Sequence, residues 1–537
     1  VRLYLDILSA VRIGPERFAI RRLLRPRKGN VMLSNLKQDL SYSLRRLIKS
    51  PGFALVCVLT LALGIGANTA MFSVINGVLL EPLPYPEPDR LVRIHTKWNN
   101  FGYGSINELE YLDILEGTDV FQDLVLYDLN AVNMVQGSGP PERVLAARIT
   151  PSLFSALGLS ALKGRNLQPG EETVPHHRVL LLSEGLWKRR FGGDETIIGK
   201  SLEISGQSFE VIGIMPPVDY PLREIELWGG FGIDPENPPH RGAHSSDLLG
   251  RLKPGVSLKK AHSQLDSLAA RLREEYPQQY PEASQFTFFA EPLSEAYTGS
   301  VRPALLILMG AVGLVLLIAC ANVAGLLLAR INARQREIAI RKALGASAGR
   351  LVGQALWETL LLSLMGGLGA LAVAQASFLT LERFYPSSLP RMEEVGLDWT
   401  VAIFTLGLIV LTTLAAGLIP ALRMTRSGSR VNLGERGGQE EGFRQRVRRV
   451  LVVKEVALAT ILLLGAGLLI RSFQHLMEVD PGFEAENLLT ARVSLPPDRY
   501  QGGQSRMQFY HQLLDDLQAR PAVLSAGVVN LVPMSGN

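Results

Sequence analysis

The sequence predicts an α-helical membrane protein that carries a large mixed α/β domain outside the cytoplasm. Hydrophobic residues make up 47% of the 537 residues, and they gather in long blocks instead of being spread along the chain. A helix needs about 20 apolar residues to cross the hydrocarbon core of a bilayer, and five blocks reach that length. Between the first two blocks lies a polar stretch, 81–301, which is long enough for a folded domain.

The five apolar blocks are the predicted membrane spans. In the fifth, Lys454 and Glu455 should lie at the membrane boundary, because a charge at mid-bilayer costs on the order of 2.5–3.5 kcal/mol. We predict transmembrane helices at 53–80, 302–330, 351–381, 399–422 and 450–471.

Positive charge predicts the orientation of these spans. Residues 1–50 carry twelve Lys/Arg and three acids, the loop 330–350 six and one, and the linker 423–449 eight and three. The stretch from Glu81 to Arg302 carries 21 Lys/Arg and 30 Asp/Glu. Cytoplasmic loops of membrane proteins are enriched in Lys and Arg, so we place the N-terminus inside and 81–301 outside. Because the positive charge lies beside spans, it gives little support to nucleic-acid binding.

The segment 1–52 is predicted to be cytoplasmic and basic. Its first part is either a solvated tail or a segment in contact with anionic lipid. From Ser34 to Lys49 the pattern is that of a helix lying on the membrane surface, ending at Pro51-Gly52. Its apolar face comprises Leu36, Leu40, Leu44, Leu47 and Ile48.

The polar stretch 81–301 alternates strand-like and helix-like patterns. Phe209–Met215 is a strand candidate, paired with Ser201–Ile204 across Gly206-Gln207. An amphipathic helix ending at Pro277 follows from the spacing of Leu258, Leu265, Leu268, Leu272 and Tyr276.

The sequence shows no catalytic or cofactor motif. Gly199-Lys200-Ser201 imitates a phosphate-binding loop, but position 194 is Asp194 where that motif needs glycine. Cys57 and Cys320 lie in apolar runs, where we expect them to pack as small side chains. We therefore expect a non-catalytic chain with no cofactor and no metal of its own. His176, His177, His240 and His244 are expected to be solvated loop residues.

Some small and polar residues within the spans are predicted to serve helix packing. Asn68 and Asn76 should bond to neighbouring helices, and Gly366-Gly367-Leu368-Gly369 should let helices approach closely. Glu358 is expected at the membrane interface, with an ion pair to residues 336–346 as the alternative.

Directly after the second span comes a short basic amphipathic helix, predicted within 331–350. It reads Arg336-Glu337-Ile338-Ala339-Ile340-Arg341-Lys342-Ala343-Leu344-Gly345-Ala346. This stretch resembles the R-E-I-x-I-R-x-A-x-G-A pattern of the FtsX-like and MacB-like permeases of ABC transporters, and it fits at each fixed position. Residues 49–91 resemble the start of MacB-like permeases, especially the duplicated ones abundant in Acidobacteria. Residues 198–217 resemble the MacB-like periplasmic core domain.

The resemblance implies a permease of the bacterial cytoplasmic (inner) membrane whose ATP and magnesium are bound by a separate cytoplasmic ATPase. Residues 336–346 would form the helix that contacts this ATPase. In that role Arg341 and Lys342 would pair with its acids, while Ile338 and Ile340 would fill its groove. The first two spans would carry the movement to 81–301, a mechanism called mechanotransmission.

The resemblance also implies a class of function and a set of partners. It implies export or extraction of a macrolide, peptide or lipoprotein, with a periplasmic adaptor as a further partner. The alternative is a signalling or scaffold permease that regulates a periplasmic cell-wall hydrolase.

The last region, 472–537, is expected to begin a second, incomplete extracytoplasmic domain. The stretch Asp480–Leu489 echoes Pro86–Leu91, which follows the first span. We therefore expect a duplicated permease that is cut short. A full-length chain would form a pseudo-dimer of two permease units, whereas a single unit would form a homodimer.

Overall fold

A computed structural model describes residues 41–529, with gaps. The gaps are positions 42, 101, 223, 345, 492, 494 and 501 and the ranges 136–140, 219–221, 385–394, 427–437, 478–487 and 496–499. The chain divides into two compact units. The helical unit comprises 1–81 and 300–483, and the sheet unit comprises 82–299 and 484–537. The basic tail, with Leu36 and Leu40, lies outside the described residues, and so does most of the predicted echo at 480–489.

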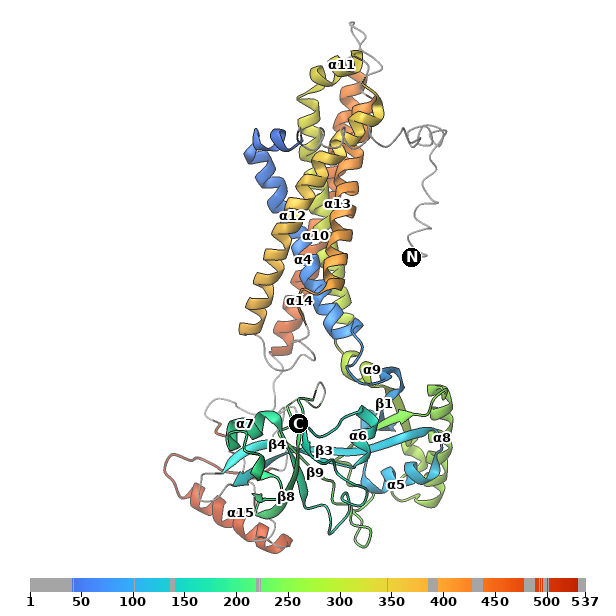
Figure 1. The fold of residues 1–537 in the computed structure, drawn as a ribbon, viewed down its shortest axis with the longest axis vertical. Helices are drawn as coiled ribbons and strands as arrows, with labels where there is room; N and C mark the ends of the chain where they lie inside the picture. The colour runs from blue at the N-terminus through green and yellow to red at the C-terminus, as the bar shows by residue number, and fades with distance from the viewer. Residues whose placement is uncertain are drawn as a thin grey trace. The chain divides into compact units, whose positions relative to one another are not determined.

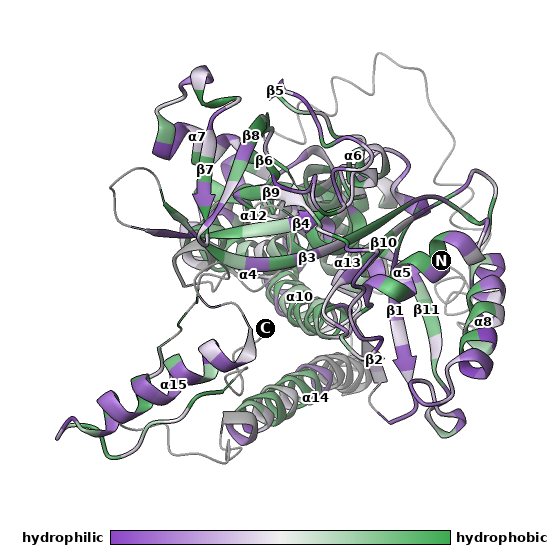
Figure 2. Ribbon diagram, turned by 90° about the horizontal axis from the view of Figure 1, so that it is seen from below, coloured by the Kyte–Doolittle hydropathy of each residue, from purple (hydrophilic) through white to green (hydrophobic). Residues whose placement is uncertain are grey.

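The helical unit is built from long apolar helices that run alongside one another (Figure 1). Within the described ranges, five helices are long and apolar enough to cross a membrane, and each overlaps a range in which the sequence predicts a span. Figure 2 shows α10 and α14 as hydrophobic over much of their length. The helices are α4 (Pro51–Ile75, continued by a π-helix at Asn76–Leu80), α10 (Arg302–Asn332), α11 (Gln335–Ala343), α12 (Ala348–Phe384), α13 (Trp399–Arg426) and α14 (Gly438–Met477).

The fifth long helix is longer than the predicted span at 450–471. It begins at Gly438, inside the range expected to be a linker. Its first turns are rich in Gln, Glu and Arg, which are good helix formers in water, so the helix does not have to end at the edge of its apolar run.

Glycines allow α12 to pack closely against its neighbours, as predicted. A Cβ on Gly366 would lie 2.7 Å from Cβ of Leu61 on α4, and one on Gly369 would lie 3.0 Å from Cβ of Ala62. Such distances leave no room for a side chain, so the two backbones can approach only where α12 has glycine.

Polar side chains also join the helices, as the sequence predicts. Asn68 donates from Nδ2 to the carbonyl of Val312 on α10 at 2.8 Å. Asn76 donates to Asp398 Oδ2, just before α13, at 2.8 Å. Cys57 and Cys320 are both buried in the apolar core of the unit, as expected.

The sheet unit contains an eleven-stranded mixed sheet, ordered β11-β1-β10-β3-β4-β9-β6-β8-β5, with β2 and β7 off this path. The strands are β1 (Leu91–Trp98), β2 (Gly102–Gly104), β3 (Phe121–Val135), β4 (Glu142–Ile149), β5 (Lys163–Gly164), β6 (Val179–Ser183), β7 (Ser201–Ile204), β8 (Gln207–Met215), β9 (Leu227–Gly230), β10 (Asp247–Leu252) and β11 (Thr287–Pro292). The helices are α5 (Glu108–Gly117), α6 (Ser152–Leu157), α7 (Glu184–Phe191), α8 (Leu258–Glu275), α9 (Leu293–Thr298) and α15 (Gly503–Gln518).

Two local predictions for this unit are confirmed. The strand pair is the antiparallel hairpin β7–β8, but its turn lies one residue earlier than the predicted Gly206-Gln207, at Ser205 and Gly206, which have φ of 49° and 89°. Positive φ at both central positions is what a two-residue hairpin turn of type I′ requires. The amphipathic helix is α8, which Ser257 caps and which buries Leu265, Leu268 and Leu272.

The residues Gly199-Lys200-Ser201 do not form a phosphate-binding loop. Gly199 adopts a φ of 85° in a turn, and Ser201 begins strand β7. A phosphate-binding loop leads into a helix whose N-terminus faces the phosphate, so the local structure agrees with the failed spacing.

Candidate functional site

The short helix α11 lies at one end of the helical unit, between α10 and α12 in the chain (Figure 1). A 2.6 Å ion pair between Arg341 and Glu337, one helical turn apart, stabilises α11. Arg341 also donates to Gln354 of α12 at 3.3 Å. The predicted basic helix is thus held against α12 by one of its own arginines.

The two faces of α11 differ in exposure. Ile338 is half-buried and lines a pocket, whereas Ile340 is 60% exposed and Leu344, just beyond the helix, is 83% exposed. Arg336 is exposed as well, and the spacing of 336, 340 and 344 places these residues on one helical face.

The residues that the resemblance assigns to contact with an ATPase therefore fall into two groups. Ile338 and Arg341 contact the chain itself, whereas Ile340 is free to meet another surface. Gly345 and the side chain of Lys342 lie outside the described residues.

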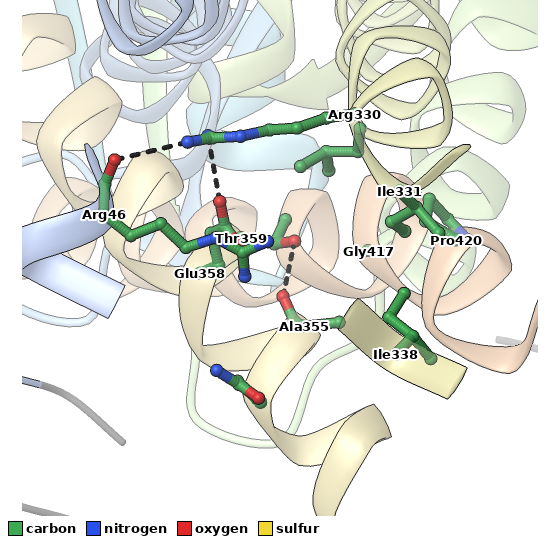
Figure 3. A pocket seen from close by; sticks show the side chains of 11 residues that line it. Arg46, Arg330, Ile331, Ile338, Ala355, Glu358, Thr359, Gly417 and Pro420 are labelled. Atoms are coloured by element: carbon green, nitrogen blue, oxygen red, sulfur yellow. Dashed lines mark hydrogen bonds and ion pairs between the residues drawn. The ribbon is translucent and has the colours of Figure 1, made fainter. Parts of the chain in front are cut away.

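A pocket lies beside α11 and draws its lining from four of the helices and from Arg46 (Figure 3). On one side, Thr359 of α12 lies close to α13, because a Cβ on Gly417 would be 2.9 Å from its Oγ1. The other lining residues are Leu327, Arg330, Ile331, Ile338, Gln354, Ala355, Glu358 and Pro420.

Glu358 lies in this pocket between two arginines. Arg46 approaches Oε2 at 3.2 Å, and Arg330 approaches Oε1 at 2.9 Å. The side chain of Glu358 is 9% exposed. A buried carboxylate is costly unless it is paired, so each arginine offsets part of the cost of burying the charge.

The structure shows which charged groups pair with Glu358. Its side chain is buried among the helices, and its described ion pairs are with Arg46 and Arg330, not with residues 336–346, which were the alternative. Sequence reasoning missed Arg46 and Arg330. The available signal was that both arginines flank apolar helices at the end of the unit where Glu358 begins its own apolar run.

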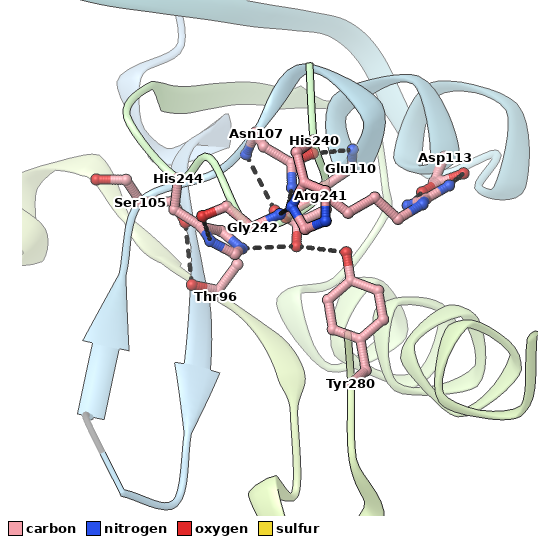
Figure 4. Close-up of polar contacts among 10 residues, drawn as sticks. All are labelled: Thr96, Ser105, Asn107, Glu110, Asp113, His240, Arg241, Gly242, His244 and Tyr280. Carbon is pink, nitrogen blue, oxygen red and sulfur yellow. Dashed lines mark hydrogen bonds and ion pairs between the residues drawn. The ribbon is translucent and has the colours of Figure 1, made fainter. Parts of the chain in front are cut away.

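A second polar cluster lies in the sheet unit around Glu110, which is fully buried (Figure 4). Its Oε1 meets His244 Nε2 at 3.0 Å and accepts from the hydroxyl of Tyr280 at 2.9 Å. Its Oε2 accepts from the backbone of Asn107, which closes a capping box at the start of α5.

His244 therefore corrects the expectation of a solvated loop histidine. Burial lowers its pKa, but the hydrogen bond and the charge of Glu110 outweigh burial and raise the pKa above the ordinary value. His176 and His240 are exposed, as expected. The half-buried His177 has a lowered pKa because of burial and the nearby Arg178.

The segment that leads into the sheet unit is anchored by arginines. Arg251 of β10 is 3% exposed and donates at 2.7 Å to the carbonyl of Pro86 and at 2.7 Å to that of Ala156. Arg90 donates to the carbonyl of Leu252 at 2.8 Å. These bonds fix the chain that follows the first long helix onto the central strands.

The segment that leaves the sheet unit is anchored by aromatic and charged contacts. The hydroxyl of Tyr297 on α9 lies 3.3 Å from that of Tyr127 on β3. Arg93 of β1 pairs with Asp247 at 2.6 Å and lies 5.5 Å from the ring centre of Tyr297. Both ends of the domain are thus bonded to the same group of strands, β1, β3 and β10.

Comparison with known families gives two matches, one after the other along the chain. The model for the MacB-like periplasmic core domain matches residues 54–268, and the model for the FtsX-like permease C-terminal region matches residues 309–428. The chain belongs to the MacB/FtsX-type permeases of ABC transporters. Residues 82–268 of the sheet unit accordingly belong to a MacB-like periplasmic core domain, and the permease is a multi-pass membrane protein.

Curated relatives are similar to parts of this permease. One is the uncharacterized ABC transporter permease YknZ of Bacillus subtilis (strain 168), with 27% identity over 37% of this chain and 48% of the relative. Another is the macrolide export ATP-binding/permease protein MacB 1 of Yersinia pestis bv. Antiqua (strain Antiqua), with 21% identity over 53% of this chain and 41% of the relative. The permease spans less than half the length of each of these relatives.

Solved structures of related domains align with the permease at low overall scores. The periplasmic region of MacB from Actinobacillus actinomycetemcomitans gives a TM-score of 0.31 at 16% identity, over 43% of this chain and 97% of that one. The extracellular domain of YknZ from Gram-positive bacteria gives 0.28 at 14% identity, over 37% of this chain and 99% of that one.

Proposed function

We propose that this permease couples ATP hydrolysis by a separate ATPase subunit to movement of its periplasmic core domain. The observation that carries the proposal is the outward face of α11, where Arg336, Ile340 and Leu344 are exposed beside one another. The positive-inside rule places this loop in the cytoplasm, with the N-terminus inside and 81–301 outside the inner membrane. Exposed isoleucine and leucine next to arginine in water suit a protein partner with an apolar groove and acidic rim.

In this proposal ATP and its magnesium belong to the partner, and this chain supplies the mechanical part. A push on α11 passes into α10 across the short turn at residues 333–334, and into α12 through the bond from Arg341 to Gln354. The bonds of Arg251 and Tyr297 support transfer from the spans to the sheet, because they fix the two connecting segments to its strands.

The same coupling supports two uses. One is export or extraction of a substrate such as a macrolide, peptide or lipoprotein, with a periplasmic adaptor as a further partner. The other is control of a periplasmic partner such as a cell-wall hydrolase. Substrate-stimulated ATPase activity in a reconstituted complex would favour transport, whereas hydrolase binding to the core domain without such stimulation would favour control. In either case we propose two permease units, as a homodimer or as halves of one longer chain.

The proposed docking face is tested by recovering the permease from membranes and identifying bound proteins by mass spectrometry. We expect an ABC ATPase with the wild type and its loss with Ile340→Glu and Leu344→Glu. Leu129→Glu is the matched control, because Leu129 is an exposed leucine of the sheet unit. Equal recovery of the ATPase with all three variants would contradict docking on this face.

A further inference from the structure

The ion pairs of Glu358 join three segments that are far apart in the sequence, at the α11 end of the helical unit (Figure 3). We call Arg46, Arg330 and Glu358 the ion triad. The side chains of the two arginines are 19% and 12% exposed, and each meets a different oxygen of Glu358. Removal of the carboxylate would leave two guanidinium groups close together with no negative charge between them.

The triad is linked to α11 from both ends of that helix. Arg330 lies in the last turn of α10, and α11 begins shortly after it at Gln335. On α12, Gln354 lies one turn before Glu358 and accepts from Arg341 of α11. Glu358 pairs with Arg330, which precedes α11 by one short turn, and Gln354 bonds to Arg341 near the end of α11. A displacement of α11 must therefore strain one of these contacts.

The triad also reaches the start of the first span. Arg330 donates to the carbonyl of Arg46 at 3.2 Å and to the hydroxyl of Ser50, which precedes α4, at 2.5 Å. Leu47 is 4% exposed in the apolar core of the helical unit, so the helical residues 43–48 are packed onto the spans.

We propose that Glu358 is a positioning residue that fixes α11 against α12 and the start of α4, so that a push on α11 reaches three spans together. The inference rests on the proposed function, which makes α11 the place where the push is applied. Without the carboxylate, α11 keeps its exposed docking face but moves independently of the segment 43–50.

The test measures the distance between α11 and the segment 43–50 in the purified permease, before any ATPase is added. Spin labels replace Ile340 and Ile48, which are both exposed, after Cys57 and Cys320 have been changed to serine. We expect one narrow distance distribution in the otherwise wild-type chain and a broader, shifted one in Glu358→Gln.

The matched control is Glu337→Gln, which removes a carboxylate of α11 that is 42% exposed and pairs within one helix. This control should leave the distribution narrow. The reversed triad, Arg46→Glu with Arg330→Glu and Glu358→Arg, restores both attractions and should restore the narrow distribution. An unchanged distribution in Glu358→Gln, or equal broadening in Glu337→Gln, would overturn the inference.

Recovery of the ATPase separates this inference from the proposed function. Unlabelled Glu358→Gln should retain as much ATPase as the wild type, because its docking face is intact, but should lose the coupling of ATP hydrolysis to movement of the core domain. If the wild type recovers no ATPase, the proposed function fails, while the distance measurement still decides whether Glu358 fixes α11.

Discussion

Arg330 and Glu358 form a 2.9 Å ion pair that joins the two helices flanking α11. Arg330 lies before α11 in the chain, and Glu358 lies after it. The pair is largely buried, with side chains 12% and 9% exposed. The pair holds α10 and α12 together at the end of the helical unit where α11 exposes its outward face.

Glu358→Ala should strongly destabilise the helical unit. Breaking a buried ion pair by removing one partner costs about 3–5 kcal/mol, because the other charge is left uncompensated. Thermal unfolding of the purified permease in detergent measures the effect as a lower Tm. Glu337→Ala is the control, and its exposed pair should contribute at most about 0.5 kcal/mol. Equal Tm values for the two variants would contradict the buried role of Glu358.

Gly366→Ala should loosen the contact between α12 and α4. The new methyl would lie 2.7 Å from Cβ of Leu61, and such overpacking costs about 1–3 kcal/mol. Gly310→Ala is the matched control on α10, because a Cβ at that position would have no neighbouring atom within 4 Å. Thermal unfolding should show a lower Tm for Gly366→Ala and an equal or higher Tm for Gly310→Ala, since alanine favours helix. The reverse order would argue against the close approach.

Arg251→Met should free the segment that leads into the core domain. The change removes the donor from the carbonyls of Pro86 and Ala156, and the unsatisfied carbonyl of the buried Ala156 costs about 1–3 kcal/mol. Limited proteolysis should then cut near residues 82–90 faster than in the wild type. Lys253→Ala is the control, because Lys253 is exposed and lies two residues after Arg251; it should leave the cleavage rate unchanged. Similar rates in both variants would show that Arg251 does not hold this segment.

The bond between His244 and Glu110 should make the core domain sensitive to pH. The pKa of His244 is raised in the folded chain, so the stabilisation is complete below its ordinary pKa of 6.5. It is lost as the pH rises through the higher folded pKa. Thermal unfolding between about pH 5 and 8 should therefore show the Tm difference between wild type and His244→Gln shrinking as pH rises. A difference that grows with pH would contradict the assignment.

The sequence predicts local features of this fold well, because their causes lie within a few residues. The pairing of β7 with β8 follows from the alternating pattern around Gly206, although the turn lies one residue earlier than predicted. The buried face of α8 follows from the spacing of Leu265, Leu268 and Leu272. The same holds for the apolar spans, whose length alone marks them.

Long-range partners were beyond the reach of the sequence. Glu358 lies 312 residues from Arg46, and no local pattern indicates that they meet. His244 is likewise 134 residues from Glu110, so its loop composition suggested solvent exposure. The outward face of α11 also had to come from the structure, because basic amphipathic spacing alone does not say which isoleucine faces the bundle.

The outward face of α11 is tested most directly by site-specific photocrosslinking in intact membranes that contain the permease and its ATPase. A photoreactive residue is placed at position 338, 340 or 344, one at a time. The account predicts adducts to an ATPase from 340 and 344, and adducts within the permease from 338, which lines the pocket. ATPase adducts from 338 but not from 340 or 344, or from none of the three positions, would contradict it.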